Sequence, residues 1–123
     1  RIYTYRGHKD RVTVAAWSAD GKHIASGSYD GTVQVWDAIN GNQVYIYHGH
    51  TGHVKTLAWS PDGKRIVSGG DDVTVHIWNA TNGEHVYKYH GHPQGVNALT
   101  WSPDGKHIAS ASDDGTVQLW QAR

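Results

Sequence analysis

Histidine, serine and aspartate recur in this chain at one fixed spacing. Each histidine follows a glycine, a serine and an aspartate come further along, and the group returns after 42 residues and again after another 42. The three groups are His8, Ser26 and Asp30; His50, Ser68 and Asp72; and His92, Ser110 and Asp114. These residue types make up nucleophilic triads, in which an acid orients a base and the base activates a serine. A catalytic triad needs one copy beside a substrate cleft, so three identically spaced copies indicate a structural role, and we expect no enzyme.

Histidine is abundant enough to raise the question of a metal site. The chain has 10 histidines and no cysteine, so thiolate ligands and disulfides are impossible. Zinc requires three or four ligands that converge on one point. The pairs His48/His50 and His90/His92 are separated by a glycine, and a turn at that glycine would point the two imidazoles apart. We therefore expect neither a metal site nor any other cofactor.

The elements that must position these residues are themselves repeated. Residues 18–37, SADGKHIASGSYDGTVQVWD, return with small changes at residues 60–79 and 102–121, which is a period of 42 residues. A fixed period of this size is typical of repeat architectures, in which each unit buries its apolar face against its neighbours. Near-copies of one unit span the chain, and no linker or low-complexity segment indicates a second domain.

The periodicity within each unit is that of β-strands. Apolar and polar residues alternate, and Asp-Gly and Asn-Gly pairs mark tight turns between the runs. The pattern predicts four strands per unit: an inner strand (Val12–Trp17, Val54–Trp59, Val96–Trp101), a second (His23–Ser28, Arg65–Gly70, His107–Ser112), a third (32–37, 74–79, 116–121) and an outer strand (44–47, 86–89, with 2–5 as a further copy).

Each unit resembles a WD repeat of the β-propeller family. The resemblance rests on a Gly-His pair, a Trp-Ser-x-Asp-Gly turn, an Ile-Ala-Ser-Gly-Ser-x-Asp-Gly-Thr segment and a final Val-x-Val-Trp-Asp. It implies an all-β propeller of four-stranded antiparallel blades, three blades per chain. The departures are Ala19 in place of proline, Val73 in place of the turn glycine, and Asn79 and Gln121 in place of the last aspartate. We expect the contribution of that aspartate to be dispensable here.

The resemblance also implies a role for the repeated polar residues. In each blade the aspartate would accept a hydrogen bond from the histidine, the histidine would orient the serine, and the serine would accept from a tryptophan N–H. The tryptophans that complete the three sets are Trp36, Trp78 and Trp120.

The order of the strands predicts that the ring is completed by other copies of the chain. The predicted units are residues 1–5, an outer strand that would close a blade of another copy; 7–47, blade 1; 49–89, blade 2; and 91–123, blade 3, which lacks its outer strand. Propellers typically have about 4–8 blades, so three cannot close alone. A homodimer with six blades is the favoured expectation, and a homotrimer with nine is the alternative. Because the chain starts at Arg1, within repeat sequence, we expect a fragment, a processed chain or an omitted tag.

The predicted function is non-catalytic binding of a protein or peptide. Positions that vary between copies on the expected ring face are candidate contacts: Arg11, His53 and Gly95; Thr13, Lys55 and Asn97; Tyr29, Asp71 and Asp113. The alternative is a purely structural self-assembling unit without a ligand, which the similarity between copies favours.

The formal net charge is zero, so nucleic acid and membrane are not expected partners. With no signal-like or transmembrane segment, we expect a soluble, cytoplasmic protein.

Overall fold

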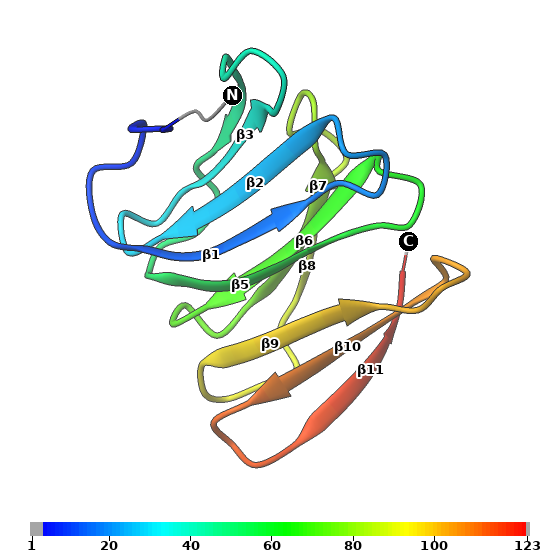
Figure 1. The fold of residues 1–123 in the computed structure, drawn as a ribbon. Coiled ribbons are helices and arrows are strands. Elements are labelled where there is room, and N and C mark those ends of the chain that lie inside the picture. Colours follow the sequence, from blue (N-terminus) through cyan, green and yellow to red (C-terminus); the bar gives the residue numbers. More distant parts are fainter. Residues whose placement is uncertain (1–3, 123) are drawn as a thin grey trace.

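Residues 4–122 are described by a computed structural model and fold into three antiparallel sheets. Blade 1 contains strands β1 to β4 in that order, blade 2 contains β5 to β8, and blade 3 contains β9 to β11. Their bounds are β1 Val12–Trp17, β2 His23–Ser28, β3 Val33–Asp37, β4 Gln43–Tyr47, β5 Val54–Trp59, β6 Arg65–Gly70, β7 Val75–Asn79, β8 Tyr87–Tyr89, β9 Val96–Trp101, β10 His107–Ser112 and β11 Val117–Gln121. Figure 1 shows the sheets side by side, with β1, β5 and β9 aligned. The prediction of an all-β chain built from antiparallel blades is confirmed.

The Asp-Gly turns form as the sequence predicts. In blade 1, Gly21 has a φ of 71°, a conformation that glycine adopts without steric cost. Asp20 fixes the turn from its side chain, because its Oδ1 accepts from Ser18 Oγ at 2.6 Å and from Lys22 N at 2.9 Å. The first and second strands then pair in register, with a bulge between Val12 and Val14.

The hydrophobic core lies between the blades rather than within one of them. One cluster joins blades 1 and 2 and includes Val33, Val35, Val54 and Leu57. A second joins blades 2 and 3 and includes the corresponding Val75, Ile77, Val96 and Leu99. Each blade therefore buries one face against the next, as a repeat unit must.

Each joint between blades also has a hydrogen bond near the inner strands. Trp59 Nε1 donates to the carbonyl of Ala16 at 3.0 Å, and Trp101 Nε1 donates to the carbonyl of Ala58 at 3.1 Å. The indoles of β5 and β9 thus reach the inner strand of the preceding blade.

At the rim, the outer strand of blade 1 contacts blade 2 through an aromatic pair. The ring of Tyr47 stacks on that of Trp78, with centroids 4.4 Å apart and planes within 5°. Gly49, two residues after this tyrosine, lies against its ring: a Cβ added to Gly49 would be 2.1 Å from Tyr47 Oη. The glycine of the Gly-His pair is therefore required by the close approach of this ring.

The last residue of the third strand acts as an acceptor for the following turn. Asp37 Oδ1 accepts from the backbone N–H of Ile39 at 2.7 Å, and Asn79 Oδ1 accepts from that of Thr81 at 3.1 Å. An amide oxygen replaces the carboxylate in blade 2, so the turn needs an acceptor but not a charge.

The edges of the array differ from the interior. Blade 3 has three strands in the part of the chain that the structure describes, and β8 is only three residues long. Of the predicted outer strand at residues 2–5, Thr4 and Tyr5 are described and are not in a strand, whereas residues 1–3 lie outside the described residues. Residues 4–122 include no helix that is long and apolar enough to cross a membrane.

Candidate functional site

The histidine, serine, aspartate and tryptophan of blade 2 meet in one buried set. His50 Nδ1 lies 2.8 Å from Asp72 Oδ2, and His50 Nε2 lies 2.7 Å from Ser68 Oγ. Trp78 Nε1 donates to the same serine oxygen at 3.0 Å. The turn between β6 and β7 supplies the aspartate, and the segment before β5 supplies the histidine, so the set ties the turn to the sheet.

Blade 3 repeats this arrangement. His92 lies 3.0 Å from Asp114 and 2.7 Å from Ser110, and Trp120 Nε1 donates to Ser110 Oγ at 2.7 Å. Hydrogen bonds from Thr116 and then His92 lower the pKa of Asp114 to about 2. The carboxylate is therefore ionised over the ordinary pH range and accepts both bonds.

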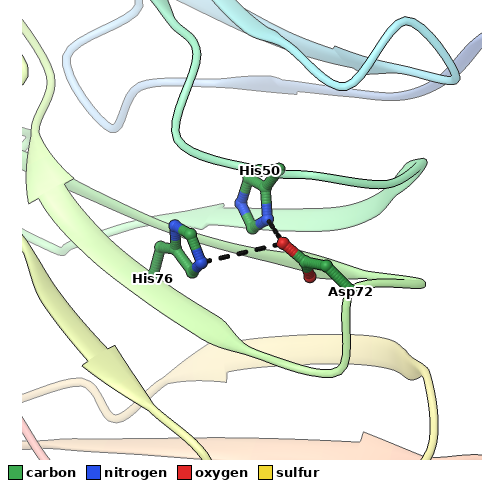
Figure 2. A group of neighbouring side chains, drawn as sticks. All are labelled: His50, Asp72 and His76. Carbon is green, nitrogen blue, oxygen red and sulfur yellow. Dashed lines mark hydrogen bonds and ion pairs between the residues drawn. The ribbon is translucent and has the colours of Figure 1, made fainter.

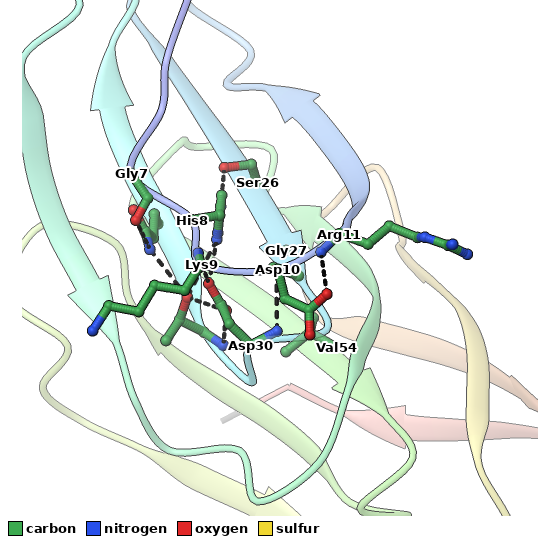
Figure 3. A network of polar contacts seen from close by, with 12 residues as sticks. Gly7, His8, Lys9, Asp10, Arg11, Ser26, Gly27, Asp30 and Val54 are labelled. Atoms are coloured by element: carbon green, nitrogen blue, oxygen red, sulfur yellow. Dashed lines mark hydrogen bonds and ion pairs between the residues drawn. The ribbon is translucent and has the colours of Figure 1, made fainter.

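Blade 1 departs from the predicted set at its tryptophan. His8 lies 3.0 Å from Asp30 Oδ2 and 2.7 Å from Ser26 Oγ, as Figure 3 shows. Trp36 Nε1, however, is buried and has no hydrogen-bond partner among the described residues. The predicted bond from Trp36 to Ser26 is wrong. The indole packs on Tyr5, with centroids 4.9 Å apart. Since this tyrosine comes from a segment outside any described strand, its ring is not fixed by a sheet as that of Tyr47 is.

The burial of the serines decides what these sets can do chemically. Ser26, Ser68 and Ser110 are all buried, so their hydroxyls have no access to a substrate. The Asp30 carboxylate is stabilised within its own turn: burial raises its pKa, but bonds from Thr32, Lys9 and His8 outweigh that effect and lower it to about 2. The sets satisfy buried polar groups and offer no accessible nucleophile.

A histidine that the sequence analysis did not select lies against the set of blade 2. His76, on β7, stacks on His50 (Figure 2). Its Nδ1 lies 2.7 Å from Tyr47 Oη. Burial, followed by the proximity of His50, lowers the pKa of His76 to about 3, so the imidazole is neutral at pH 7. The signal in the sequence is that blades 1 and 3 have glutamine at this position, Gln34 and Gln118.

Five of the candidate ring-face residues of blades 1 and 2 form a continuous row. Tyr29 stacks on His53 with centroids 4.0 Å apart, and the Arg11 guanidinium lies 5.4 Å from the centre of the Tyr29 ring. His53 Nδ1 lies 3.2 Å from Asp71 Oδ2, and Lys55 Nζ lies 3.0 Å from Asp71 Oδ1. The structure thus joins side chains that the sequence offers only as variable positions.

The remaining candidates have different environments. Asn97 donates to Asp113 at the exposed end of blade 3. Thr13 is partly committed to the fold, because its Oγ1 donates to the carbonyl of Val54 at 2.6 Å and so bridges blades 1 and 2. At Gly95, a Cβ would lie 3.5 Å from Asp71 Oδ1 and 3.4 Å from Asp113 Oδ2, so both carboxylates flank this glycine.

Comparison with known proteins identifies the repeat. The family model for the WD domain, or G-beta repeat, matches residues 1–37, 41–79 and 83–121. The chain belongs to the WD40 repeat family. The crystal structure of the RRP9 WD40 repeats superposes with a TM-score of 0.89 and 29% identity, covering 94% of this chain and 37% of that one. WD40 repeats generally form non-catalytic interaction scaffolds.

Curated WD40 relatives match this chain over about one repeat. Protein tipD of Dictyostelium discoideum is 59% identical over 32 residues, 26% of this chain and 5% of that protein. The target of rapamycin complex subunit wat1 of Schizosaccharomyces pombe is 50% identical over 36 residues, 29% of this chain and 12% of that protein. Protein HIRA of Zea mays is 45% identical over 40 residues, covering 32% and 4%. The matched segments are thus a small part of each relative.

Proposed function

We propose that this chain is a non-catalytic protein- or peptide-interaction scaffold that assembles head to tail with copies of itself into a closed propeller ring. The observation that carries the assembly is a contrast in burial between equivalent positions. Val33 and Val35 of blade 1 are 0% and 1% exposed, and Val75 and Ile77 of blade 2 are 1% and 0%. Their counterparts in blade 3, Val117 and Leu119, are each 73% exposed.

The opposite end of the array has the complementary feature. On the inner strand of blade 1, Val12 is 51% exposed, whereas the equivalent Val54 and Val96 are both 0% exposed. Trp17 is 62% exposed, although its counterpart Trp101 is 9% exposed. Full burial of one such apolar side chain contributes about 1.5–3 kcal/mol, so covering both faces would be strongly favourable.

The internal joints provide a template for the contact between copies. Trp59 and Trp101 donate to the carbonyls of Ala16 and Ala58 in the preceding blade. In a contact between copies, the same relation would bring Trp17 Nε1 to the carbonyl of Thr100 in the other copy. A hollow of about 180 Å³ on the open face of blade 3, lined by Leu99, Ala109 and Val117 among others, lies where that copy would pack.

Tyr5 supports closure by an exchanged outer strand. It stacks on Trp36 and its Oη donates to Gln34 Oε1 at 2.7 Å, much as Tyr47 stacks on Trp78 and contacts His76. In blade 1, Tyr47 pairs with Val33 across the sheet. By the same register, residues 1–5 would pair with β11 of another copy, with Tyr5 opposite Val117.

The ring face of the chain has a positive charge at the blade 1 end and a negative charge at the blade 3 end. Arg11 stands at the open end of blade 1, and the exposed Asp113 stands at the open end of blade 3. Tyr29 and Asp71 are the equivalents of Asp113 in blades 1 and 2. Tyr29 stacks on His53 of blade 2, and Asp71 lies beside Gly95 of blade 3. Head-to-tail assembly would bring Asp113 beside Arg11 of the next copy, which favours one polarity of association.

The ring size that we favour is six blades from a homodimer, with nine blades from a homotrimer as the alternative. Six lies within the usual range of about 4–8 blades, and two-fold closure is the commonest symmetry of soluble oligomers. The ring face is the proposed surface for a protein or peptide partner, and the zero net charge makes nucleic acid and membrane poor partners.

Solution mass tests the assembly. We expect light scattering to give a discrete mass of two chains, or three for the nine-bladed ring, and deletion of residues 1–5 to abolish it. Leu119→Lys should also give monomers, because it places a charge in the proposed joint. Ile39→Lys is the matched control: Ile39 is 71% exposed but lies in a turn away from the joints, and this variant should keep the parent mass. A folded monomeric parent, or an intact ring after the deletion, would contradict the proposal.

The second candidate function is a structural ring without a ligand. The pairing of the ring-face residues favours it, since Tyr29, His53, Lys55 and Asp71 already have partners within the chain. A peptide array distinguishes the two functions. One saturable partner that is lost in Tyr29→Ala would support the binding scaffold, and blank arrays with an intact ring would support the structural unit.

A further inference from the structure

Blade 2 has a buried histidine that the other two blades lack. Where blades 1 and 3 have Gln34 and Gln118, blade 2 has His76. The imidazole of His76 stacks on that of His50, with centroids 3.9 Å apart and planes 19° from parallel. Figure 2 shows both rings beside the carboxylate of Asp72. Two imidazoles and one carboxylate therefore meet at one place inside the blade.

The ligand atoms of these three residues are close enough to share an ion. Asp72 Oδ2 lies 2.8 Å from His50 Nδ1 and 3.7 Å from His76 Nε2, and all three atoms are within 4.8 Å of one another. Zinc binds nitrogen at about 2.0–2.1 Å and carboxylate oxygen at about 2.0–2.2 Å, so two ligands of one ion stand roughly 3.0–3.4 Å apart. Small rotations of the side chains would bring the three atoms to that spacing.

Both imidazoles are held in place at their other nitrogen. His50 Nε2 lies 2.7 Å from Ser68 Oγ, and His76 Nδ1 lies 2.7 Å from Tyr47 Oη. A hydrogen bond at the second ring nitrogen orients histidine ligands in metal sites and fixes their tautomer. In blade 2 these bonds leave His50 Nδ1 and His76 Nε2 directed toward the carboxylate.

We propose that His50 Nδ1, His76 Nε2 and Asp72 Oδ2 bind one zinc ion in blade 2. Two nitrogens and one carboxylate oxygen suit zinc and similar divalent transition metals, whereas calcium and magnesium prefer sites made of oxygen alone. On binding, the ring proton of His50 moves from Nδ1, which takes the ion, to Nε2, which then donates to Ser68 Oγ. Thr74 Oγ1, 2.7 Å from His76 Nε2, gives up that hydrogen bond when the nitrogen binds the ion.

The site is specific to blade 2. In blades 1 and 3, the histidine and aspartate are present but the third ligand is a glutamine, whose neutral amide oxygen is a poor ligand for zinc. One zinc ion per chain follows from this difference.

Isothermal titration of the full chain with zinc chloride, in a buffer that does not chelate, tests the site. We expect the parent to bind one zinc ion per chain and His76→Gln to lose that ion. Because this substitution installs the residue that blades 1 and 3 already have, the variant should fold. His90→Gln, which removes an exposed histidine from the end of the same blade, is the matched control and should bind as the parent does.

Thermal melts provide a second measurement. A ligand that binds only the folded state raises the melting temperature, so zinc should raise that of the parent and of His90→Gln but not that of His76→Gln. Zinc binding of equal affinity and stoichiometry in His76→Gln would overturn the proposal, because it would assign the ion to surface histidines. The absence of binding in the parent at millimolar zinc would overturn it as well.

Discussion

At the scale of single residues, one serine oxygen in each blade determines how completely the buried polar set is satisfied. Ser68 Oγ contacts both His50 Nε2 and Trp78 Nε1, whereas Ser26 Oγ contacts His8 and is not reached by Trp36. The same residue type at the same place in the repeat therefore has a different number of partners in blades 1 and 2.

We expect Ser68→Ala to destabilise the protein more than Ser26→Ala does. Each buried polar group left without a partner costs about 1–3 kcal/mol. Ser68→Ala leaves two such groups without a partner, His50 Nε2 and Trp78 Nε1. Ser26→Ala removes the partner of His8 Nε2 only. Urea unfolding of the two variants measures the difference, with each acting as the other's control. Equal midpoints would mean that the bond from Trp78 contributes nothing.

At the scale of elements, the turn between the second and third strands shows where blade 2 is strained. Gly31 and Gly115 have φ values of 84° and 86° in blades 1 and 3, and Val73 has a φ of 62° at the equivalent position. A β-branched residue in this left-handed region is an outlier that costs on the order of 1–2 kcal/mol. The turn is nevertheless formed, because the hydrogen bond from Val73 N to the carbonyl of Gly70, at 3.3 Å, follows the pattern of its counterparts.

Val73→Gly should therefore stabilise the protein by about 0.5–1 kcal/mol. The gain is the removed strain less the greater conformational entropy of glycine in the unfolded chain, about 0.5–1 kcal/mol. Thermal or urea unfolding measures the change. The reverse substitution, Gly31→Val, is the control and should destabilise blade 1 by a similar amount. If Val73→Gly is no more stable than the parent, the conformation of this turn carries no strain.

At the scale of the whole molecule, the proposed joint between copies cannot be identical to the internal joints. Gly27 and Gly69 allow close approach there: a Cβ on them would lie 2.7 Å from Val54 Cγ1 and 3.1 Å from Val96 Cγ1. Blade 3 has Ala111 at this position. In the assembled ring its methyl group would meet Val12 of the next copy and hold the joint wider.

Ala111→Gly should consequently strengthen the association of copies. We expect a lower dissociation constant by sedimentation or light scattering across a dilution series, on the order of tenfold for about 1.4 kcal/mol of relieved crowding. Ala109→Gly is the opposed control. It removes a methyl group at the position where Ala25 and Val67 are buried in the internal joints, so it should weaken association. Association unchanged or weakened in Ala111→Gly would show that the copies do not meet as the blades do.

The amino-acid sequence by itself determined the repeat, the strands and most of the polar sets. Strand positions follow from alternating residues and from turn pairs such as Asp20-Gly21, and these are local properties that neighbouring residues fix. The 42-residue period gives every blade a histidine, a serine and an aspartate at the positions of His50, Ser68 and Asp72. The resemblance to WD repeats predicts how these side chains pair. Sequence reasoning therefore gave the β-structure and the members of each set.

Tertiary structure decided what depends on the packing of one blade against another. His76 became part of the blade 2 cluster only through its stacking on His50, and Trp36 lacks the bond to Ser26 that the repeat predicts, although it stacks on Tyr5. Exposure at Val117 and Leu119 likewise depends on whether a further blade covers them. Repeated sequence specifies similar blades, but blades 1 and 3 each pack against one neighbouring blade within the described residues. Burial on their other faces is therefore set by the arrangement of blades in space and not by the residues alone.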